Sequence, residues 1–283
     1  MAIEFDLRDG FAGAVDPERA SPAFANRLAA IADAGEGVLV VPPGRWVVDE
    51  EVRLTTRGSS LQGAGMRASV IEVQAGARTH GVVVEAGGVT IERLTVLGNR
   101  ESLDDDDGFH GIRAGSDDAD WLHIRDVCVE QAPAYGIGLQ RASYEFVLIE
   151  NVSIRECGRD GIDFKNVHDV GSRCFLKNVT VERHGLREAN TAGIDIRGNV
   201  RMQNIEVIGV GEGRSGVRFR SGERGSQNGL GGDWSGLVNY FVTTSGSPAR
   251  GVDNSDLTGV RVENGNVVAL ASQGPDQGRP QRR

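Results

Sequence analysis

The 283-residue sequence predicts an all-β protein, a right-handed parallel β-helix with an N-terminal capping helix. A glycine followed by alternating apolar residues recurs every 23 to 35 residues, a period typical of solenoids. These glycines are Gly81, Gly111, Gly136, Gly161, Gly193, Gly216 and Gly251. About a dozen residues after most of them, a second segment alternates apolar and polar residues with the period of a strand. One slot in that segment holds a residue that tolerates left-handed backbone: Asp126, Asn151, Asn178, Asn204 and Asn239.

The N-terminal residues 1–36 are expected to cap the first coil. Phe24, Leu28 and Ile31 recur at helical spacing within residues 21–34, which predicts an amphipathic helix with Ser21-Pro22 at its N-cap. Such a helix would cover the open end of the core and the first sheet edge. Residues 37–48 then predict two short strands around a Pro-Gly turn.

Residues 37–272 are expected to form one β-helical domain, because a solenoid grows along one axis and needs no second core. Its last strand segment is expected at Leu237–Val242, in the frame of Met202–Val207. Residues 221–236 lack the repeat and are rich in glycine, so we expect a long loop of the kind that often carries function. The polar residues 273–283 are expected to form a flexible tail.

Composition narrows the function classes. A net charge of −9 argues against nucleic acid and anionic membranes as partners, and no apolar run has membrane-spanning length. The first residues have no signal-peptide pattern, so we expect a cytoplasmic protein or one exported by a leaderless route. Cys128, Cys157 and Cys174 have no metal-site spacing and are expected to be buried or half-buried thiols. No organic cofactor is expected, and the oligomeric state is left open.

Equivalent residues of adjacent coils should be neighbours, because parallel strands lie about 4.8 Å apart. Alignment on the repeat glycine places His110, Tyr135 and Asp160 in one column, each directly before its glycine. Proton transfer needs groups at this spacing, so the three are our candidate catalytic residues. The alternative is a structural role, in which these residues, at the start of a strand, only form hydrogen bonds with the turns.

Two further columns should point away from the core. The second position after the glycine holds Arg113, Gly138, Asp163, Asp195 and Arg218, and the fourth holds Gly115, Gln140, Lys165, Arg197 and Arg220. Cations here suit a carboxylate or sulfate ligand, whereas the alternative is a solvated face of mixed charge. The candidate substrate-binding residues are Asp107, Gln140, Asp163, Lys165, Asp195, Arg197, Arg218 and Arg220.

The densest charge in the chain is Asp104-Asp105-Asp106-Asp107. Hard cations take several carboxylate oxygens, so this run is a candidate calcium site. A solvated acidic loop is the alternative.

Residues 38–71, with Val41-Pro42-Pro43-Gly44 and Leu61-Gln62-Gly63-Ala64-Gly65, resemble the entry segment of the pectate-lyase-like β-helix superfamily, which includes calcium-dependent enzymes. Five segments, at 60–66, 94–100, 107–109, 135–136 and 158–161, are similar to the catalytic module of the mannuronan C5-epimerases, a resemblance that spans roughly residues 20–220. This resemblance implies exchange of the C5 proton of a uronate. It matches Tyr135 to the family's tyrosine, and Asp107 and Asp160 to its acidic positions.

The chain departs from that family at the remaining catalytic positions. The family's Y-G-F-D-P-H is replaced by a run in which Gly138 stands for the aspartate and Gln140 for the histidine. Its R-H-G corresponds to Thr191-Ala192-Gly193, so the general acid/base histidine is missing. Residues 190–195 also resemble the N-T-D-G-I-D of polygalacturonases, but Ala192 replaces the catalytic aspartate.

The leading hypothesis is a carbohydrate-active enzyme of the lyase or epimerase type, which removes a proton alpha to a carboxylate in an anionic, uronate-like sugar. Arg197, Lys165 or Arg220 would neutralise that carboxylate. Tyr135 would act as base or acid, its phenol made more acidic by adjacent cations. His110 would be the second proton-transfer group, oriented or assisted by Asp160.

Two other function classes are left open. The first is a non-catalytic β-helix of phage or surface type that binds glycans or is structural. The second is an intracellular isomerase or cyclase that acts on a small biosynthetic intermediate. The expected partner is therefore an anionic oligosaccharide or polysaccharide, or a small carboxylate substrate.

Overall fold

The structure is a computed structural model. It describes residues 3–9, 15–104, 108–116, 118–141, 144–166, 173–198, 200–210, 214–220, 242–246, 250–253, 260–263 and 266–269. The side chains of residues 166, 198, 201, 210, 219 and 220, and all those from 242 onward, lie outside this description.

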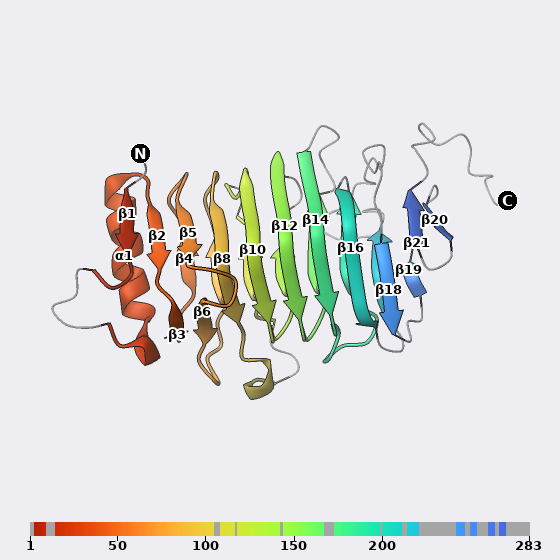
Figure 1. Ribbon diagram of the computed structural model, residues 1–283, viewed down its shortest axis with the longest axis horizontal. Coiled ribbons are helices and arrows are strands. Elements are labelled where there is room, and N and C mark those ends of the chain that lie inside the picture. Colours follow the sequence, from red (N-terminus) through yellow and green to blue (C-terminus); the bar gives the residue numbers. More distant parts are fainter. Residues whose placement is uncertain are drawn as a thin grey trace.

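The described elements follow one another along a solenoid axis (Figure 1). The helices are η1 (Pro17–Arg19), α1 (Ser21–Ala34) and η2 (Arg100–Ser102). The strands are β1 (Glu4–Asp6), β2 (Val38–Val41), β3 (Gly44–Val48), β4 (Val52–Leu54), β5 (Ser60–Gly63), β6 (Ser69–Val73), β7 (Val82–Val84), β8 (Thr90–Leu97), β9 (Ile112–Ala114), β10 (Leu122–Glu130), β11 (Ile137–Leu139), β12 (Phe146–Arg155), β13 (Ile162–Asn166), β14 (Arg173–Glu182), β15 (Ala192–Gly198), β16 (Arg201–Val210), β17 (Ser215–Arg220), β18 (Val242–Gly246), β19 (Arg250–Asp253), β20 (Val260–Glu263) and β21 (Asn266–Ala269).

The strands form a long sheet and a short sheet. The long sheet runs in the order β1-β2-β5-β8-β10-β12-β14-β16-β18-β21-β20, with β3 and β6 beside it, and the short sheet runs β4-β7-β9-β11-β13-β15-β17-β19. Among the described pairs, only β18 with β21 and β20 with β21 are antiparallel. The protein is therefore a right-handed parallel β-helix with an N-terminal helix, as the repeat predicts.

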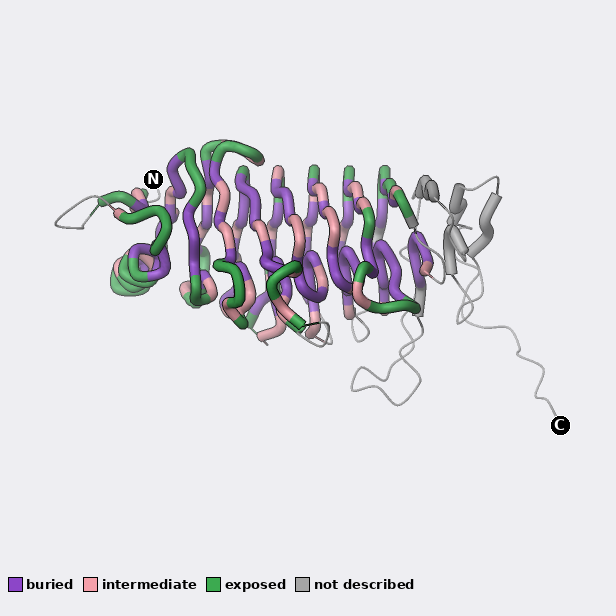
Figure 2. Tube along the Cα trace, turned by 90° about the horizontal axis from the view of Figure 1, so that it is seen from below, coloured by how far each residue is buried: buried purple, intermediate pink, exposed green. Residues whose placement is uncertain are grey.

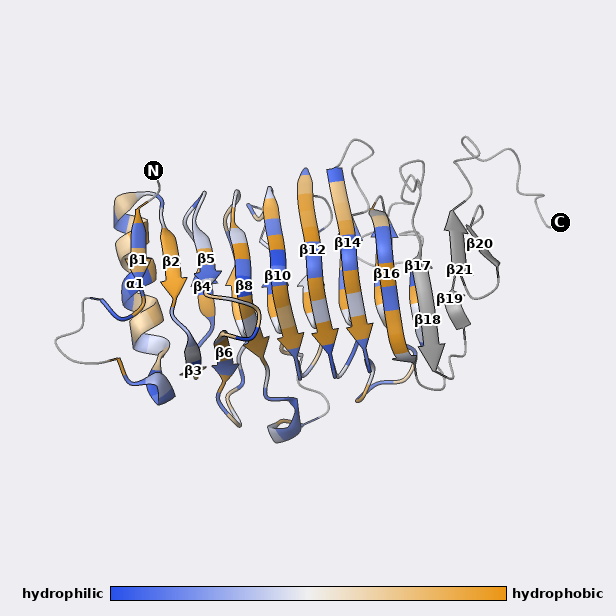
Figure 3. Ribbon diagram, in the orientation of Figure 1, coloured by the Kyte–Doolittle hydropathy of each residue, from blue (hydrophilic) through white to orange (hydrophobic). Residues whose placement is uncertain are grey.

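The core is a stack of aliphatic rungs held in register. Ile137 pairs with Ile112 on one side and Ile162 on the other, and all three are fully buried. Figure 3 shows the alternation of hydrophobic and hydrophilic residues along β10, β12 and β14. Figure 2 shows the strands as buried rungs joined by more exposed turns. All three cysteines are buried free thiols, as expected.

The polar turn slot adopts the left-handed backbone that the sequence predicts. Asp126, Asn151, Asn178 and Asn204 have φ between 52° and 54°. Their side chains form a ladder of hydrogen bonds. Each asparagine Nδ2 donates to the Oδ1 of the equivalent residue in the preceding coil, at 2.9–3.2 Å. Stacked side-chain bonds of this kind help to hold the coils in register.

The repeat glycines are required by close backbone approach. A Cβ added to Gly81, Gly111, Gly136, Gly161 or Gly193 would lie 2.6–2.8 Å from the carbonyl oxygen of the next repeat glycine. Each would also collide with a valine or isoleucine methyl of the long sheet. No residue with a side chain fits at these positions, where the chain turns into a short-sheet strand, without displacing the backbone.

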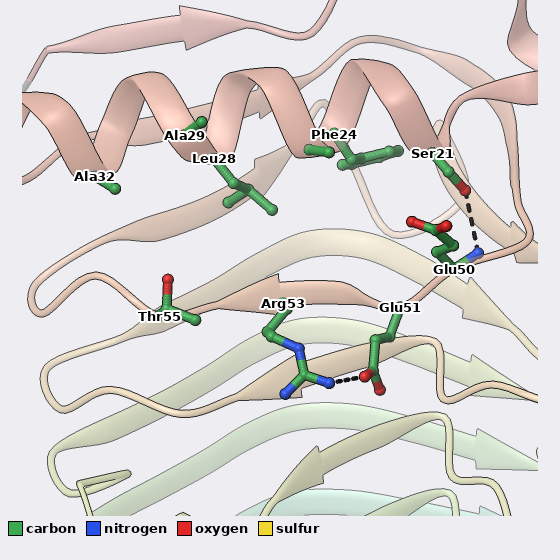
Figure 4. A pocket seen from close by; sticks show the side chains of 10 residues that line it. Ser21, Phe24, Leu28, Ala29, Ala32, Glu50, Glu51, Arg53 and Thr55 are labelled. Carbon is green, nitrogen blue, oxygen red and sulfur yellow. Dashed lines mark hydrogen bonds and ion pairs between the residues drawn. The ribbon is translucent and has the colours of Figure 1, made fainter.

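The N-terminal cap differs from expectation in two details. Ser21 does not cap α1; its Oγ accepts hydrogen bonds from the Asp49 and Glu50 amides and so ties the helix to the first coil (Figure 4). Strand β1 lies before the helix and pairs with β2, which extends the long sheet. Between α1 and β4 lies a cavity of about 250 Å³, lined on the helix side by Phe24 and Leu28.

The C-terminal part differs in register. Val242 pairs with Ile205 and not with Val207, so the strand frame expected for Leu237–Val242 is wrong by two residues. The glycine half of the repeat at Gly251 is confirmed, because Val252 pairs with Val217. The expected loop at 221–236 and tail at 273–283 lie outside the described residues. No helix among the described residues is long and apolar enough to cross a membrane.

Gly136→Ala is expected to destabilise the protein by about 1–3 kcal/mol, because its Cβ would lie 2.5 Å from the Ile154 Cγ2 and 2.7 Å from the Gly161 oxygen. Urea unfolding measures the loss. Gly65→Ala is the control, since its Cβ would meet nothing closer than 3.6 Å. Equal stability of the two variants would contradict the steric origin of the repeat.

Candidate functional site

The candidate catalytic column forms as predicted. The Gly111 amide donates to the Tyr135 carbonyl (3.1 Å) and the Gly136 amide donates to the Asp160 carbonyl (3.2 Å), so His110, Tyr135 and Asp160 occupy consecutive coils. The His110 and Tyr135 ring centroids lie 4.8 Å apart. Tyr135 is half-buried and stands outside the apolar core, whereas His110 and Asp160 are each only 5% exposed.

His80 extends this column by one coil and is absent from the sequence-based candidates. Its ring centroid lies 4.9 Å from that of His110, and its Nδ1 accepts a hydrogen bond of 2.9 Å from the His110 amide. Burial and the nearby Arg113 lower the pKa of His80 to about 4. The signal was available, since His80 directly precedes Gly81, the first repeat glycine.

The ring of His110 lies over Gly138. A Cβ at Gly138 would come within 2.8 Å of the His110 Cδ2, so the missing side chain leaves the space that the ring occupies. Burial lowers the pKa of His110 to about 3, against a smaller opposing effect of its hydrogen bond with Gln140. His110 is therefore neutral at working pH and is a weak base.

Three buried aspartates form a cluster next to the column. Asp163 and Asp195 pair in register on β13 and β15 and are fully buried, and one carboxylate oxygen of each lies within 4.8 Å of one from Asp160. Asp160 also accepts a 2.6 Å hydrogen bond from the Ala192 amide. Burial, followed by the charges of Asp195 and Asp163, raises the pKa of Asp160 to about 8.

Three cations surround these carboxylates. Lys165 lies 3.7 Å from Asp163, and Arg197 lies 3.8 Å from Asp163 and 3.9 Å from Asp195. Arg218 donates from Nε to Asp195 (2.8 Å) and from Nη1 to the Asn190 carbonyl (2.7 Å). These side chains offset the negative charge of the carboxylate cluster.

Arg218 does not have the expected substrate-facing position. Its side chain is only 7% exposed, and besides Asp195 and Asn190 it approaches Asp160 at 3.6 Å. It acts as an internal counter-ion. Lys165 and Arg197 retain more exposure, 18% and 15% of their side chains, and are the cations nearest to the surface in this cluster.

The pKa of Tyr135 shifts opposite to the sequence-based expectation. Burial, and then the negative charges of Asp163 and Asp160, raise it to about 12, and these effects outweigh Arg159 and Arg197. Burial is the largest cause of this shift, and the buried carboxylates of Asp163 and Asp160 add to it. Tyr135 is therefore a neutral proton donor.

The acidic run is described only at Asp104, since Asp105, Asp106 and Asp107 lie outside the described residues, as does the side chain of Arg220. Arg187 donates to the carbonyl oxygens of Asp104 and Leu103, both at 2.6 Å, and of Arg100. The Arg187 guanidinium thus already bonds the backbone carbonyls of Leu103 and Asp104. Calcium binding here stays a prediction.

No protein-family model and no curated protein sequence matches the chain. Solved structures share the fold. The catalytic unit of a thermostable GH87 α-1,3-glucanase from Streptomyces thermodiastaticus strain HF3-3 superposes with a TM-score of 0.60 at 19% identity, over 86% of this chain and 47% of that one. An N-terminal fragment of gene product 12 of bacteriophage Phi29 gives 0.59 at 17%, over 88% and 42%.

A mannuronan C-5 epimerase A-module from Azotobacter vinelandii gives a TM-score of 0.53 at 17% identity, over 89% of this chain and 90% of the module. This chain thus spans less than half of the glucanase and phage chains and most of the epimerase module. At these identities the likeness shows the shared β-helix fold, which these carbohydrate-processing enzymes and a phage protein use for different ends.

Asp160→Asn tests the buried carboxylate. The raised pKa means that the folded state holds a proton that the unfolded state releases near pH 3.8, so this group makes stability fall as pH rises through about 8. Asparagine keeps an acceptor for the Ala192 amide and cannot ionise. We expect the melting temperature of Asp160→Asn, relative to the parent, to rise between pH 5 and pH 8. If the difference in melting temperature between Asp160→Asn and the parent stays constant from pH 5 to pH 8, the raised pKa of Asp160 is contradicted.

Proposed function

We propose that this protein is a carbohydrate-active enzyme that transfers a proton alpha to a carboxylate in an anionic, uronate-like glycan, as an epimerase or a lyase. One observation carries the proposal: a half-buried tyrosine in a column of proton-transfer groups lies beside the cations of a buried ion cluster. The resemblance of the Tyr135, Asp160 and Asp107 segments to mannuronan C5-epimerases supports the same chemistry.

The reaction assigns different tasks to the exposed and the buried groups. Arg197 and Lys165 would face the sugar carboxylate and stabilise the negative charge that develops when the C5 proton leaves. Tyr135, protonated at neutral pH, would donate a proton to C5 in epimerisation, or to the departing O4 in elimination. Asp160 in its ionised form is the better base of the remaining pair, because the pKa of His110 is too low for that ring to retain a proton. With its pKa raised to about 8, the ionised form of Asp160 becomes more populated as pH rises.

Hydrolysis by the aspartate cluster fits the geometry less well. Glycosidases place two carboxyl groups about 5–5.5 Å or about 6.5–9.5 Å apart, with the scissile bond between them. Here Asp163 and Asp195 are fully buried beneath their cations and are not exposed to a sugar. The cluster is better placed to set the charge around Tyr135 than to hold a sugar between its members.

A second candidate is a β-helix that binds an anionic glycan without changing it. The burial of His110 and Asp160, each 5% exposed, favours this candidate, because a general base must reach the proton that it removes. Turnover separates the two functions.

Tyr135→Phe removes the donor oxygen and keeps the ring, so it should lower turnover on the order of a hundredfold or more and leave the fold intact. The measurement is the absorbance of unsaturated ends near 230 nm, together with the proton NMR spectrum of the product, over a panel of polyuronates. Tyr144→Phe is the matched control. Its hydroxyl donates to the Ala114 carbonyl (2.7 Å) inside the core, so its loss should reduce stability by about 1 kcal/mol and not turnover.

Arg197→Gln should raise KM for the polymer and weaken its dependence on salt, since this residue acts through charge.

If Tyr135→Phe were as active as the parent on the best substrate, proton transfer by Tyr135 would be wrong. If the parent bound a polyuronate and changed none, the binding function would replace the catalytic one.

A further inference from the structure

The cations on the outer face of the short sheet differ in how their charge is balanced. Arg53 on β4 pairs with Glu51 and Glu85. Lys165, Arg197 and Arg218 pair with the buried aspartates. Arg113 on β9 is exposed, and no carboxylate among the described residues lies within ion-pair distance of it. It is therefore the uncompensated cation among the described side chains of this face.

We propose that Arg113, with His80 and Phe109 beside it, forms an anion-binding subsite that takes the carboxylate of a uronate-type sugar, one coil before Tyr135. This inference deepens the proposed function and rests on it for the identity of the ligand as a sugar. It also moves the principal anion contact away from the cations that the sequence favoured.

The hydrogen bonds of His80 leave the Arg113 guanidinium available. The His80 Nδ1 accepts from the His110 amide at 2.9 Å, whereas its Nε2 lies 3.4 Å from Arg113 Nη1. A neutral imidazole accepts at one nitrogen only, and the shorter backbone contact takes that role. We therefore assign the ring proton to Nε2, so that Nε2 accepts nothing from Arg113. The guanidinium can then offer a bidentate pair of N–H groups to a carboxylate.

The neighbours of Arg113 suit a sugar. The guanidinium lies along the sheet above Gly115, where an added Cβ would be 3.5 Å from its Nε, so no side chain covers it from that position. The half-buried Phe109 ring lies 5.6 Å from the His80 ring, nearly perpendicular to it at 72°. Phe109 adjoins Arg113 through His80, and the Arg78 guanidinium lies 6.0 Å from the centroid of the Phe109 ring. The aromatic pair supplies apolar surface for a pyranose, and Arg113 supplies a partner for its carboxylate.

The position relative to Tyr135 gives the subsite its role. Arg113 pairs in register with Gly138 on β11, the strand that Tyr135 precedes, so the two residues belong to adjacent coils about 4.8 Å apart. Gly138 carries no side chain between Arg113 and Asp163, and the His110 ring lies in that space. A glycan lying along the solenoid axis would therefore place one carboxylate at Arg113 and the neighbouring sugar at Tyr135.

Binding of a single sugar tests the subsite without requiring turnover. The protein, labelled with ¹³C in its five histidines, is titrated with D-glucuronate and, separately, with D-glucose, while the ring signals of His80 are followed by NMR. His80→Gln assigns those signals. We expect a saturable shift of the His80 signals with glucuronate and none with glucose. Arg113→Gln should weaken glucuronate binding at least tenfold.

Arg53→Gln is the matched control. It removes the same charge from the same outer column, but at a side chain that two glutamates already neutralise, so glucuronate binding should stay within twofold of the parent. No saturable shift in the parent, or equal affinity in Arg113→Gln and the parent, would overturn the subsite. If glucuronate binds through Arg113 while no polyuronate is turned over, the subsite stands and the proposed catalysis fails. If polyuronate is turned over while glucuronate binding is indifferent to Arg113, the catalysis stands and the subsite fails.

Discussion

The arrangement of this protein depends on one close contact, the approach of successive backbones at the corner before each short-sheet strand. There a repeat glycine lies so near the next glycine's carbonyl that a Cβ would come within 2.6–2.8 Å of it. Because every coil must meet its neighbour at this corner, the coils stack in register, and residues beside the glycine form columns about 4.8 Å apart. The left-handed turn slot and its asparagine ladder fix a second corner. The alignment of His80, His110, Tyr135 and Asp160 follows from these two corners.

The chemistry of the site follows from charge that is buried on the outside of the solenoid. Asp163 and Asp195 point away from the aliphatic core, yet they are fully buried beneath Lys165, Arg197 and Arg218. Charges held in such a place act strongly on their neighbours, because water does not screen them. Burial raises the pKa of both Tyr135 and Asp160, and these charges raise it further. The same carboxylates offset much of the positive charge that a ligand would otherwise meet. Arg113, two strands away from Asp163, keeps its charge for a ligand.

Sequence reasoning predicted what depends on periodicity. The helix at Ser21–Ala34, the paired sheets, the turn slot and the column of His110, Tyr135 and Asp160 all follow from residue spacing. The features that it missed depend on side-chain contacts and burial, which the spacing of residues in the sequence does not specify. The burial of Arg218 comes from its bonds to Asp195 and to the Asn190 carbonyl, and the raised pKa of Tyr135 comes from desolvation. His80 was within reach of the same alignment, whereas the role of Ser21 required knowing where the first coil ends.

The central claim is that the column removes and returns a proton alpha to a sugar carboxylate. The most direct measurement is incubation of the protein with polymannuronate, polyguluronate and polygalacturonate in D₂O, with the C5 position followed by proton NMR. The mechanism predicts loss of the C5 proton signal of at least one of these polymers, with inversion or with an unsaturated end, and formation of that product on the order of a hundredfold more slowly by Tyr135→Phe. Retention of the C5 proton in every polyuronate that the protein binds would contradict it.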